Sequence, residues 1–292
     1  MHEQEVETNV SLVRRMLASQ FPRWAHLPIE PLPSIGTVNA IYRLGDDLYV
    51  RLPRVGRWAA DLERELRWLP RLAQHLPLAV PEPLAKGSPG DGYPFTWAVY
   101  RWLPGEPWTD HLVRDPSRAA ADLAAFVGAL QGIDTHGGPP SGRGTTLAMH
   151  DAEARRAIES LDGVVDPGTV TAAWEAALQA PVWDGRPVWT HGDLLPPNLL
   201  VHQGRLSGVI DFGIVGLGDP ACDMIAAWSV LSGRAREVFR ASLQVDDTTW
   251  ERGRGWALSI ALPIIPYYRN TNPAFVAMAI RMIDQILQAE RT

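Results

Sequence analysis

The sequence predicts an α+β protein with two lobes, a small β-rich lobe followed by a larger helical one. Two observations carry this prediction: residues 1–100 contain short apolar segments separated by Gly and Pro turns, whereas after Gly105 apolar residues recur mostly at helical spacing. The 292 residues, 46% of them apolar, suffice for two coupled lobes with real cores. We therefore expect an N-terminal lobe at 1–100, a connection at 101–105 and a helical C-terminal lobe at 106–292.

Each element of the first lobe follows from a local pattern. Apolar residues at helical spacing indicate a helix at 6–17, and the Gly45-Asp46-Asp47 turn joins two strands into a hairpin. The segment at 77–94 is rich in Pro and Gly and predicts a loop with at most short strands. The remaining expected elements are strands at 29–32, 40–44, 48–52 and 95–103, and a helix at 57–69 that Pro70 bends or ends.

The second lobe reads as mostly helical, with two short strands. Its Gly- and Pro-rich segment at 135–145 predicts a surface loop. The expected helices lie at 116–133, 151–161, 167–180 and 219–231, with a long C-terminal stretch to Glu290, and the strands lie at 187–190 and 206–210.

Composition excludes several classes of partner. The net charge is −6, all of it from residues 101–292, and no cluster of Lys or Arg suggests nucleic acid. The longest apolar stretch, 256–268, is too short to cross a bilayer, so no membrane partner is expected. The acidic first residues lack a secretion-signal pattern, and the single Cys222 forms no internal disulfide. We expect a soluble cytoplasmic protein, and its oligomeric state stays open.

Two segments carry the pattern of a chemical site. Residues 190–198 read T-H-G-D-L-L-P-P-N, and 210–213 read I-D-F-G, with Asp211 thirteen residues after Asn198. Phosphoryl transfer needs positioned metal ions and a group that orients the acceptor hydroxyl. Mg²⁺ prefers oxygen ligands, so Asn198 and Asp211 are the predicted metal ligands, and Asp193 is the residue that takes or orients the hydroxyl proton. Asp and Asn are also common turn and capping residues, but two such elements in this order favour catalysis.

With these motifs, the sequence resembles the aminoglycoside phosphotransferase family of the protein-kinase-like superfamily, over nearly the whole chain from about Ser34. Further matching segments are YVRLPR at 49–54, VPEPL at 80–84, YRWLPG at 100–105 and GDPACD at 218–223. The resemblance implies a protein-kinase-like fold and ATP-dependent transfer of the γ-phosphate to a hydroxyl of an aminoglycoside-like molecule, as in antibiotic resistance. It also implies that Asp193 is catalytic and that Asn198 and Asp211 hold one or two Mg²⁺ ions.

The same resemblance implies an ion pair in the nucleotide-binding lobe. A basic residue on the third strand would hold the α- and β-phosphates, fixed by a glutamate of the following helix; here these are Arg51 and Glu65. Protein kinases have lysine at the strand position, whereas the only lysine in this chain is Lys86. Guanidinium is always charged and binds phosphate bidentately, so arginine suits the role. The alternative is that Arg51 and Glu65 are unrelated surface charges.

The resemblance implies two further sets of nucleotide contacts, one to the phosphates and one to the base. Ser34 and Thr37 belong to a loop at 34–39 that would cover the phosphates, although a plain hairpin with a Gly turn fits this stretch nearly as well. The Arg101 carbonyl and the Leu103 amide would bind the base. Backbone contacts of this kind leave ATP and GTP both open as the donor.

The acceptor is expected on the helical lobe, and for an aminoglycoside it would be a cation. One alternative is a catalytically silent protein that binds nucleotide as a regulator. It is kept open by Arg51 and by Pro197, since the family commonly has Gly at the position of Pro197. Macrolide, homoserine and choline kinases are further alternatives. Only five residues separate Gly213 from Asp219, too few for the activation segment of a protein kinase. Acidic candidates are Glu106, Asp110, Asp151, Glu153, Asp246, Asp247, Glu251 and Asp284, and aromatic ones for a macrolide are Trp256, Tyr267, Tyr268 and Phe275.

Overall fold

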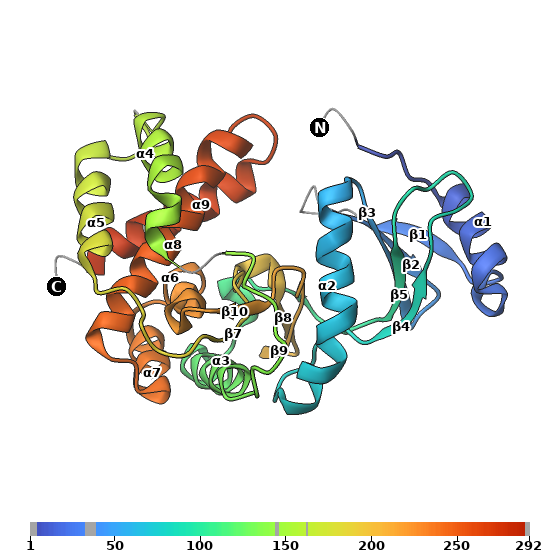
Figure 1. Ribbon diagram of the computed structural model, residues 1–292, viewed down its shortest axis with the longest axis horizontal. Helices are drawn as coiled ribbons and strands as arrows, with labels where there is room; N and C mark the ends of the chain where they lie inside the picture. The colour runs from blue at the N-terminus through green and yellow to red at the C-terminus, as the bar shows by residue number, and fades with distance from the viewer. Residues whose placement is uncertain (1–4, 33–38, 144–145, 162, 290–292) are drawn as a thin grey trace. The chain divides into compact units, whose positions relative to one another are not determined.

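The computed structural model describes residues 5–32, 39–143, 146–161 and 163–289 (Figure 1). The chain folds into two compact units. The first unit comprises the described residues up to Gly105 together with 208–214, and the second comprises those at 106–207 and from Val215 onward. The α+β prediction is confirmed, since a five-stranded antiparallel sheet lies in the first unit and most helices lie in the second.

The sheet of the first unit has the strand order β1-β2-β3-β5-β4, with every neighbouring pair antiparallel. Gly45 adopts a φ of 59° in the β2–β3 hairpin, a left-handed conformation that glycine reaches without a Cβ clash. The strands are β1 Ile29–Leu32, β2 Asn39–Leu44, β3 Leu48–Pro53, β4 Pro83–Gly87 and β5 Trp97–Arg101.

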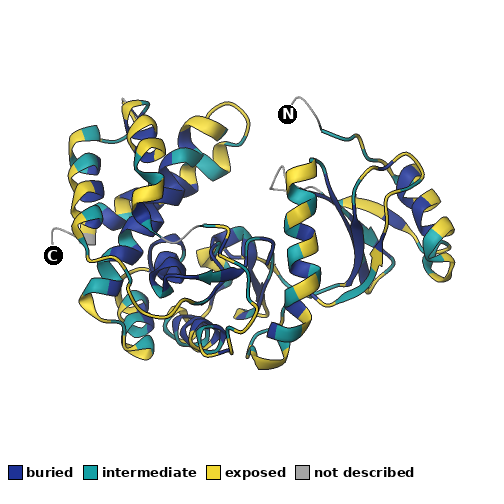
Figure 2. Ribbon diagram, in the orientation of Figure 1, coloured by how far each residue is buried: buried dark blue, intermediate teal, exposed yellow. Residues whose placement is uncertain are grey.

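Strand alternation assigns the two faces of this sheet to different helices. Val50 and Val99 belong to the core cluster that contains the buried residues of α1 (Val10–Gln20). Tyr100 packs instead with Leu62 of α2 (Gly56–Leu72) on the other face. Figure 1 shows α1 and α2 on opposite sides of the sheet, and Figure 2 shows that α2 is exposed on its outer side.

Two helix boundaries in the first unit differ from the predicted ones. Helix α1 begins at Val10 rather than residue 6, because the Asn9 side chain accepts a hydrogen bond from Leu12 N at 2.9 Å and so caps the helix there. Helix α2 continues past Pro70 to Leu72. Leu69 and Leu72 are both fully buried, so packing of the apolar face outweighs the hydrogen bond that proline removes. Short 3-10 helices follow at Pro22–Trp24 and Ala73–His75.

The second unit is built around α8, which packs against α9, α4 and α5. Its helices are α3 Pro116–Gln131, α4 Asp151–Glu159, α5 Pro167–Gln179, α6 Ala226–Ser229, α7 Gly233–Leu243, α8 Asp247–Tyr268 and α9 Pro273–Ala289. Its short strands are β6 Glu106–Pro107, β7 Val188–Thr190, β8 Leu199–His202, β10 Gly216–Gly218 and the start of β9 Arg205–Val209. Its 3-10 helices are Asp110–Leu112, Leu147–His150, Pro196–Asn198 and Pro220–Ile225.

Two helical predictions in this unit were too coarse. The expected helix at 219–231 is a 3-10 helix followed by the single turn of α6, and the C-terminal stretch is divided into α7, α8 and α9. Asp219 accepts a hydrogen bond from Ala221 N at 2.9 Å, which caps the 3-10 helix at its second residue. No helix in the described parts of the chain is both long and apolar enough to span a lipid bilayer.

Candidate active site

In the first unit, Arg51 of β3 is 6% exposed and contacts two carboxylates. Its Nη1 lies 2.9 Å from Glu65 Oε2, and its Nη2 lies 2.7 Å from Asp211 Oδ1. Burial by itself would lower the pKa of Arg51. The carboxylates of Glu65 and Asp211 raise the pKa by more than burial lowers it, so the pKa lies above its ordinary value. The structure therefore brings together three of the residues singled out from the sequence, with one guanidinium bridging two acids.

Glu65 is fully buried and joins three segments of the first unit. Besides Arg51, it accepts hydrogen bonds from the Tyr100 hydroxyl at 2.5 Å and from Phe212 N at 2.9 Å. A buried carboxylate is tolerated only when its oxygens are paired in this way. Glu65 on α2 thus ties the position of β3 and β5 to the Asp-Phe-Gly turn.

Asp211 adopts an unusual backbone conformation with a φ of 65°. Non-glycine residues in the left-handed region are uncommon, and such strain clusters at functional sites. Its side chain is 39% exposed although Oδ1 is held by Arg51. The residue therefore presents carboxylate oxygens, a ligand type that Mg²⁺ prefers, from a turn with an uncommon backbone conformation.

The predicted base-binding residues lie at the end of the first unit. Arg101 N donates to Glu82 O at 3.0 Å, and the Arg101 side chain pairs with Glu82 Oε2 at 2.6 Å. Among the described residues, the Leu103 amide donates no hydrogen bond, which leaves it available to a ligand. Ser34 and Thr37, predicted to cover the phosphates, lie outside the described residues.

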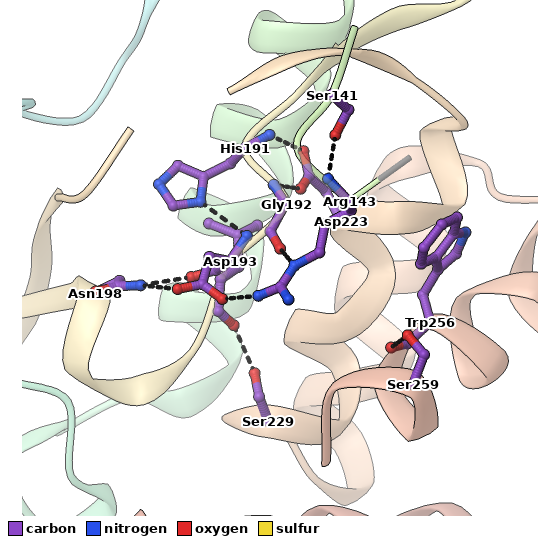
Figure 3. A network of polar contacts seen from close by, with 11 residues as sticks. Ser141, Arg143, His191, Gly192, Asp193, Asn198, Asp223, Ser229, Trp256 and Ser259 are labelled. Atoms are coloured by element: carbon purple, nitrogen blue, oxygen red, sulfur yellow. Dashed lines mark hydrogen bonds and ion pairs between the residues drawn. The ribbon is translucent and has the colours of Figure 1, made fainter. Parts of the chain in front are cut away.

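In the second unit, Asp193 and Asn198 lie within hydrogen-bonding distance (Figure 3). Asn198 Nδ2 donates to Asp193 Oδ2 at 2.7 Å and to the Asp193 carbonyl at 2.9 Å. Because the nitrogen is used in this way, the amide oxygen of Asn198 is the atom left for a hard cation. Pro197 sits inside the 3-10 turn Pro196–Asn198, where its fixed φ suits the helix start.

Asp223 anchors the beginning of the loop that contains Asp193. Its carboxylate is fully buried, and it accepts hydrogen bonds from His191 N at 2.8 Å and Gly192 N at 2.7 Å. Burial raises the pKa of Asp223, and His191 and the two N–H donors only partly offset this. His191 is itself buried, and its Nδ1 accepts from Asp193 N at 3.2 Å. No site role was predicted for Asp223 from the sequence, although the GDPACD segment that contains it was one of the segments matching the family.

Arg143 is the second residue that sequence reasoning missed. Its Nη2 pairs with Asp193 Oδ1, and its Nε donates to the Gly192 carbonyl at 2.7 Å (Figure 3). The segment 135–145 carried only the signal of a Gly- and Pro-rich surface loop. No local pattern could reveal a contact between residues fifty positions apart.

Residues 29–256 match the model of the phosphotransferase enzyme family. The chain belongs to this family. The predicted resemblance is thereby confirmed, and the prediction of a phosphotransferase is confirmed at the level of the family.

Two curated relatives resemble this phosphotransferase-family chain. The uncharacterized protein YcbJ of Bacillus subtilis (strain 168) is 29% identical over 157 residues, 52% of this chain and 49% of its own length. An aminoglycoside 3'-phosphotransferase of Escherichia coli is 28% identical over 226 residues, 70% of this chain and 76% of its own. The chain thus aligns with about half of the first relative and three quarters of the second.

Solved structures share the fold of this family member. The GDP and kanamycin complex of an APH(2'') enzyme has a TM-score of 0.74 at 22% identity, covering 96% of this chain and 99% of the other. Macrolide 2'-phosphotransferase MphH from Brachybacterium faecium has a TM-score of 0.63 at 21% identity, covering 94% and 97%. The predicted protein-kinase-like fold is confirmed.

Many of the acidic acceptor candidates in this phosphotransferase-family chain already have partners. Asp151 accepts from Trp174 Nε1 at 2.8 Å, and Asp110 pairs with Arg281 at 3.0 Å. Asp246 caps α8, Asp247 pairs with Arg240, and Glu251 pairs with Arg254. Of the aromatic candidates, Trp256 is fully buried in the core, whereas Tyr267 is 52% exposed. Internal pairing reduces the attraction that these carboxylates offer to a cationic ligand.

The two predicted metal ligands, Asn198 and Asp211, each offer an oxygen atom of the kind that Mg²⁺ binds. Within the described ranges, no three His, Cys, Asp or Glu side chains gather to hold an ion by themselves. Mg²⁺ is commonly bound by one or two protein oxygens together with substrate phosphates and water. The Asn198 amide oxygen and the exposed Asp211 carboxylate are groups of the kind this binding uses.

Proposed function

We propose that the chain is an ATP-dependent phosphotransferase that transfers the γ-phosphate to a hydroxyl of a small, aminoglycoside-like molecule. The observation that carries the proposal is the Asp193 carboxylate, which accepts a hydrogen bond from Asn198 and pairs with Arg143 on a loop whose backbone amides bind Asp223. Family membership supports the reaction class, and the relative named as an aminoglycoside 3'-phosphotransferase supports the acceptor class.

Asp193 acts on the acceptor hydroxyl in this proposal. A carboxylate held by donors on both oxygens keeps a fixed orientation and accepts the hydroxyl proton as the oxygen attacks phosphorus. Asn198 and Asp211 would hold Mg²⁺, which neutralises charge on the transferred phosphoryl group. In this proposal the other residues of the site position the nucleotide and the acceptor for transfer.

The first unit supplies the donor contacts. Arg51, fixed by Glu65, binds the phosphates with its guanidinium, and the Arg101 carbonyl and Leu103 amide bind the base. ATP and GTP both satisfy backbone contacts, and the solved relative with GDP bound supports a purine nucleotide. Ser34 and Thr37 stay predicted phosphate contacts.

A macrolide is the second candidate acceptor. The pairing of Asp110, Asp247 and Glu251 with arginines favours it, because the helical unit then offers fewer unpaired carboxylates to a polycation. A structure named as a macrolide 2'-phosphotransferase shares the fold.

A coupled assay tests the function. Purified protein with Mg²⁺ and either ATP or GTP is offered aminoglycosides, macrolides and small alcohols, and release of the nucleoside diphosphate is measured. We expect acceptor-dependent turnover that Asp193→Ala abolishes while nucleotide binding persists. Glu237→Ala, at an exposed pair with Arg234, is the matched control and keeps parental turnover. Tight nucleotide binding without turnover on any acceptor would instead identify a regulator.

A further inference from the structure

The Asp193 carboxylate is held from both sides (Figure 3). Oδ2 accepts from Asn198 Nδ2 at 2.7 Å, and Oδ1 accepts from Arg143 Nη2. The same guanidinium reaches the Gly192 carbonyl through Nε at 2.7 Å. A carboxylate offers about four lone-pair sites, so these two donors fix its plane and leave sites for a further donor.

The backbone around Arg143 is held by two hydrogen bonds, one at Arg143 itself and one at Ser141. Its carbonyl accepts a hydrogen bond from His150 Nε2 at 2.8 Å, so that ring nitrogen carries the proton. The His150 ring lies edge-on to the buried Trp256, with centroids 5.4 Å apart. Upstream, Ser141 N donates to the Leu217 carbonyl on β10 at 3.0 Å. The arginine therefore extends from a segment that is attached to the core rather than from a free surface loop.

We propose that Arg143 is a positioning residue for phosphoryl transfer, which turns the Asp193 carboxylate so that an unused lone pair meets the acceptor hydroxyl. The inference rests on the proposed function. The planar guanidinium fork contacts a carbonyl and a carboxylate together, which the single ammonium of lysine cannot do with the same geometry. Asn198 contacts only Oδ2 of the carboxylate, so the donor on Oδ1 comes from Arg143.

The test uses the full chain and compares Arg143→Gln, Arg143→Lys and Arg143→Ala with the parent. We expect Arg143→Gln to lower kcat by about 10- to 100-fold, the scale of a misplaced catalytic group, with KM for ATP changed less than about twofold. Arg143→Lys recovers only part of the loss. Millimolar methylguanidine restores part of the activity of Arg143→Ala, an effect that a purely structural role would not give.

Arg234→Gln is the control, since it removes an exposed arginine that also pairs with a carboxylate. It keeps parental kcat and does not respond to methylguanidine. Parental or higher kcat in Arg143→Gln would overturn the inference, because Arg143 would then be a bystander or an inhibitory contact. So would an Arg143→Ala variant that folds, has lost activity and gains nothing from methylguanidine. If the parent transfers phosphate to no acceptor, the proposed function itself fails, and that outcome is distinct.

Discussion

Glu65 illustrates how one buried side chain connects the candidate site residues of the first unit. Its oxygens accept hydrogen bonds from Arg51, Tyr100 and Phe212 N, so three segments depend on a single carboxylate. Removing one partner of a buried pair costs more than the pair contributes, because the remaining charge stays without compensation.

Replacing Glu65 with Gln is expected to lower stability by about 3 kcal/mol, since Arg51 loses one of its two carboxylates while remaining buried. Urea unfolding measures the loss, and a binding titration should show weaker nucleotide binding. Glu63→Gln, on the same helix but 53% exposed and paired with Lys86, is the control and should cost less than about 1 kcal/mol. Equal stability of both variants would show that the buried pair is unimportant.

At the scale of elements, two aspartates of one short 3-10 helix, Pro220–Ile225, connect neighbouring segments. Asp223 lies within this helix and Asp219 caps it. Asp223 accepts from two consecutive backbone amides of the loop leading to Asp193. Asp219 caps the helix and pairs with the buried Arg252 at 2.8 Å. One short helix thus fixes a loop and joins it to α8.

Asp223→Asn tests the loop anchor. Asparagine offers one side-chain oxygen, so one of the two amides loses its acceptor, which costs about 1–3 kcal/mol for a buried donor. We expect kcat to fall while nucleotide affinity is kept, as steady-state kinetics and a binding titration would show. Asp115→Asn, which retains a capping oxygen at the exposed start of α3, should change neither quantity.

The cap of α8 predicts a pH dependence. The hydrogen bond from Thr249 N holds the pKa of Asp246 below its ordinary value. A lowered pKa adds stability above the ordinary Asp pKa, and this stability is lost as the pH falls through the folded-state value. Asp246→Ala should therefore cost about 1 kcal/mol at pH 7 and less near pH 3, measured by denaturant unfolding. Asp246→Asn keeps a capping oxygen and should cost less at pH 7; an Ala penalty unchanged at low pH would contradict this account.

At the scale of the whole molecule, the site residues are divided between two compact units. Arg51, Glu65 and Asp211 belong to the first, and Asp193 and Asn198 belong to the second. Each unit therefore holds part of the predicted set of site residues.

A nucleotide with Mg²⁺ should stabilise the folded chain. Ligand at about 100 times its Kd adds roughly 2.7 kcal/mol, which raises Tm by several degrees. Thermal unfolding with ATP and Mg²⁺ measures the shift, and chelation of the metal should reduce it. Asp211→Asn should lower the metal-dependent part of the shift. The same shift in Asp211→Asn as in the parent would exclude Asp211 as a metal ligand.

The sequence alone determined the features that local patterns encode. Short apolar segments bounded by turn residues predicted β1 at its observed bounds and placed Arg51 within β3. The motif spacing singled out Asp193, Asn198 and Asp211. Their catalytic roles stay predictions. The ends of helices were less predictable. Helix α2 continues past Pro70 because its apolar face is packed, and α1 begins only at Val10 because the Asn9 side chain caps it there.

Only the tertiary structure decided which distant side chains meet. Arg143 reaches Asp193 from fifty residues away, and Asp223 reaches the same loop from thirty-one residues beyond Gly192. The spacing of residues in the sequence predicts local secondary structure. Contacts between distant residues depend instead on how whole segments pack, which residue spacing does not encode. The motif therefore indicates which residue is the predicted catalytic group, and the fold decides which distant side chains contact it.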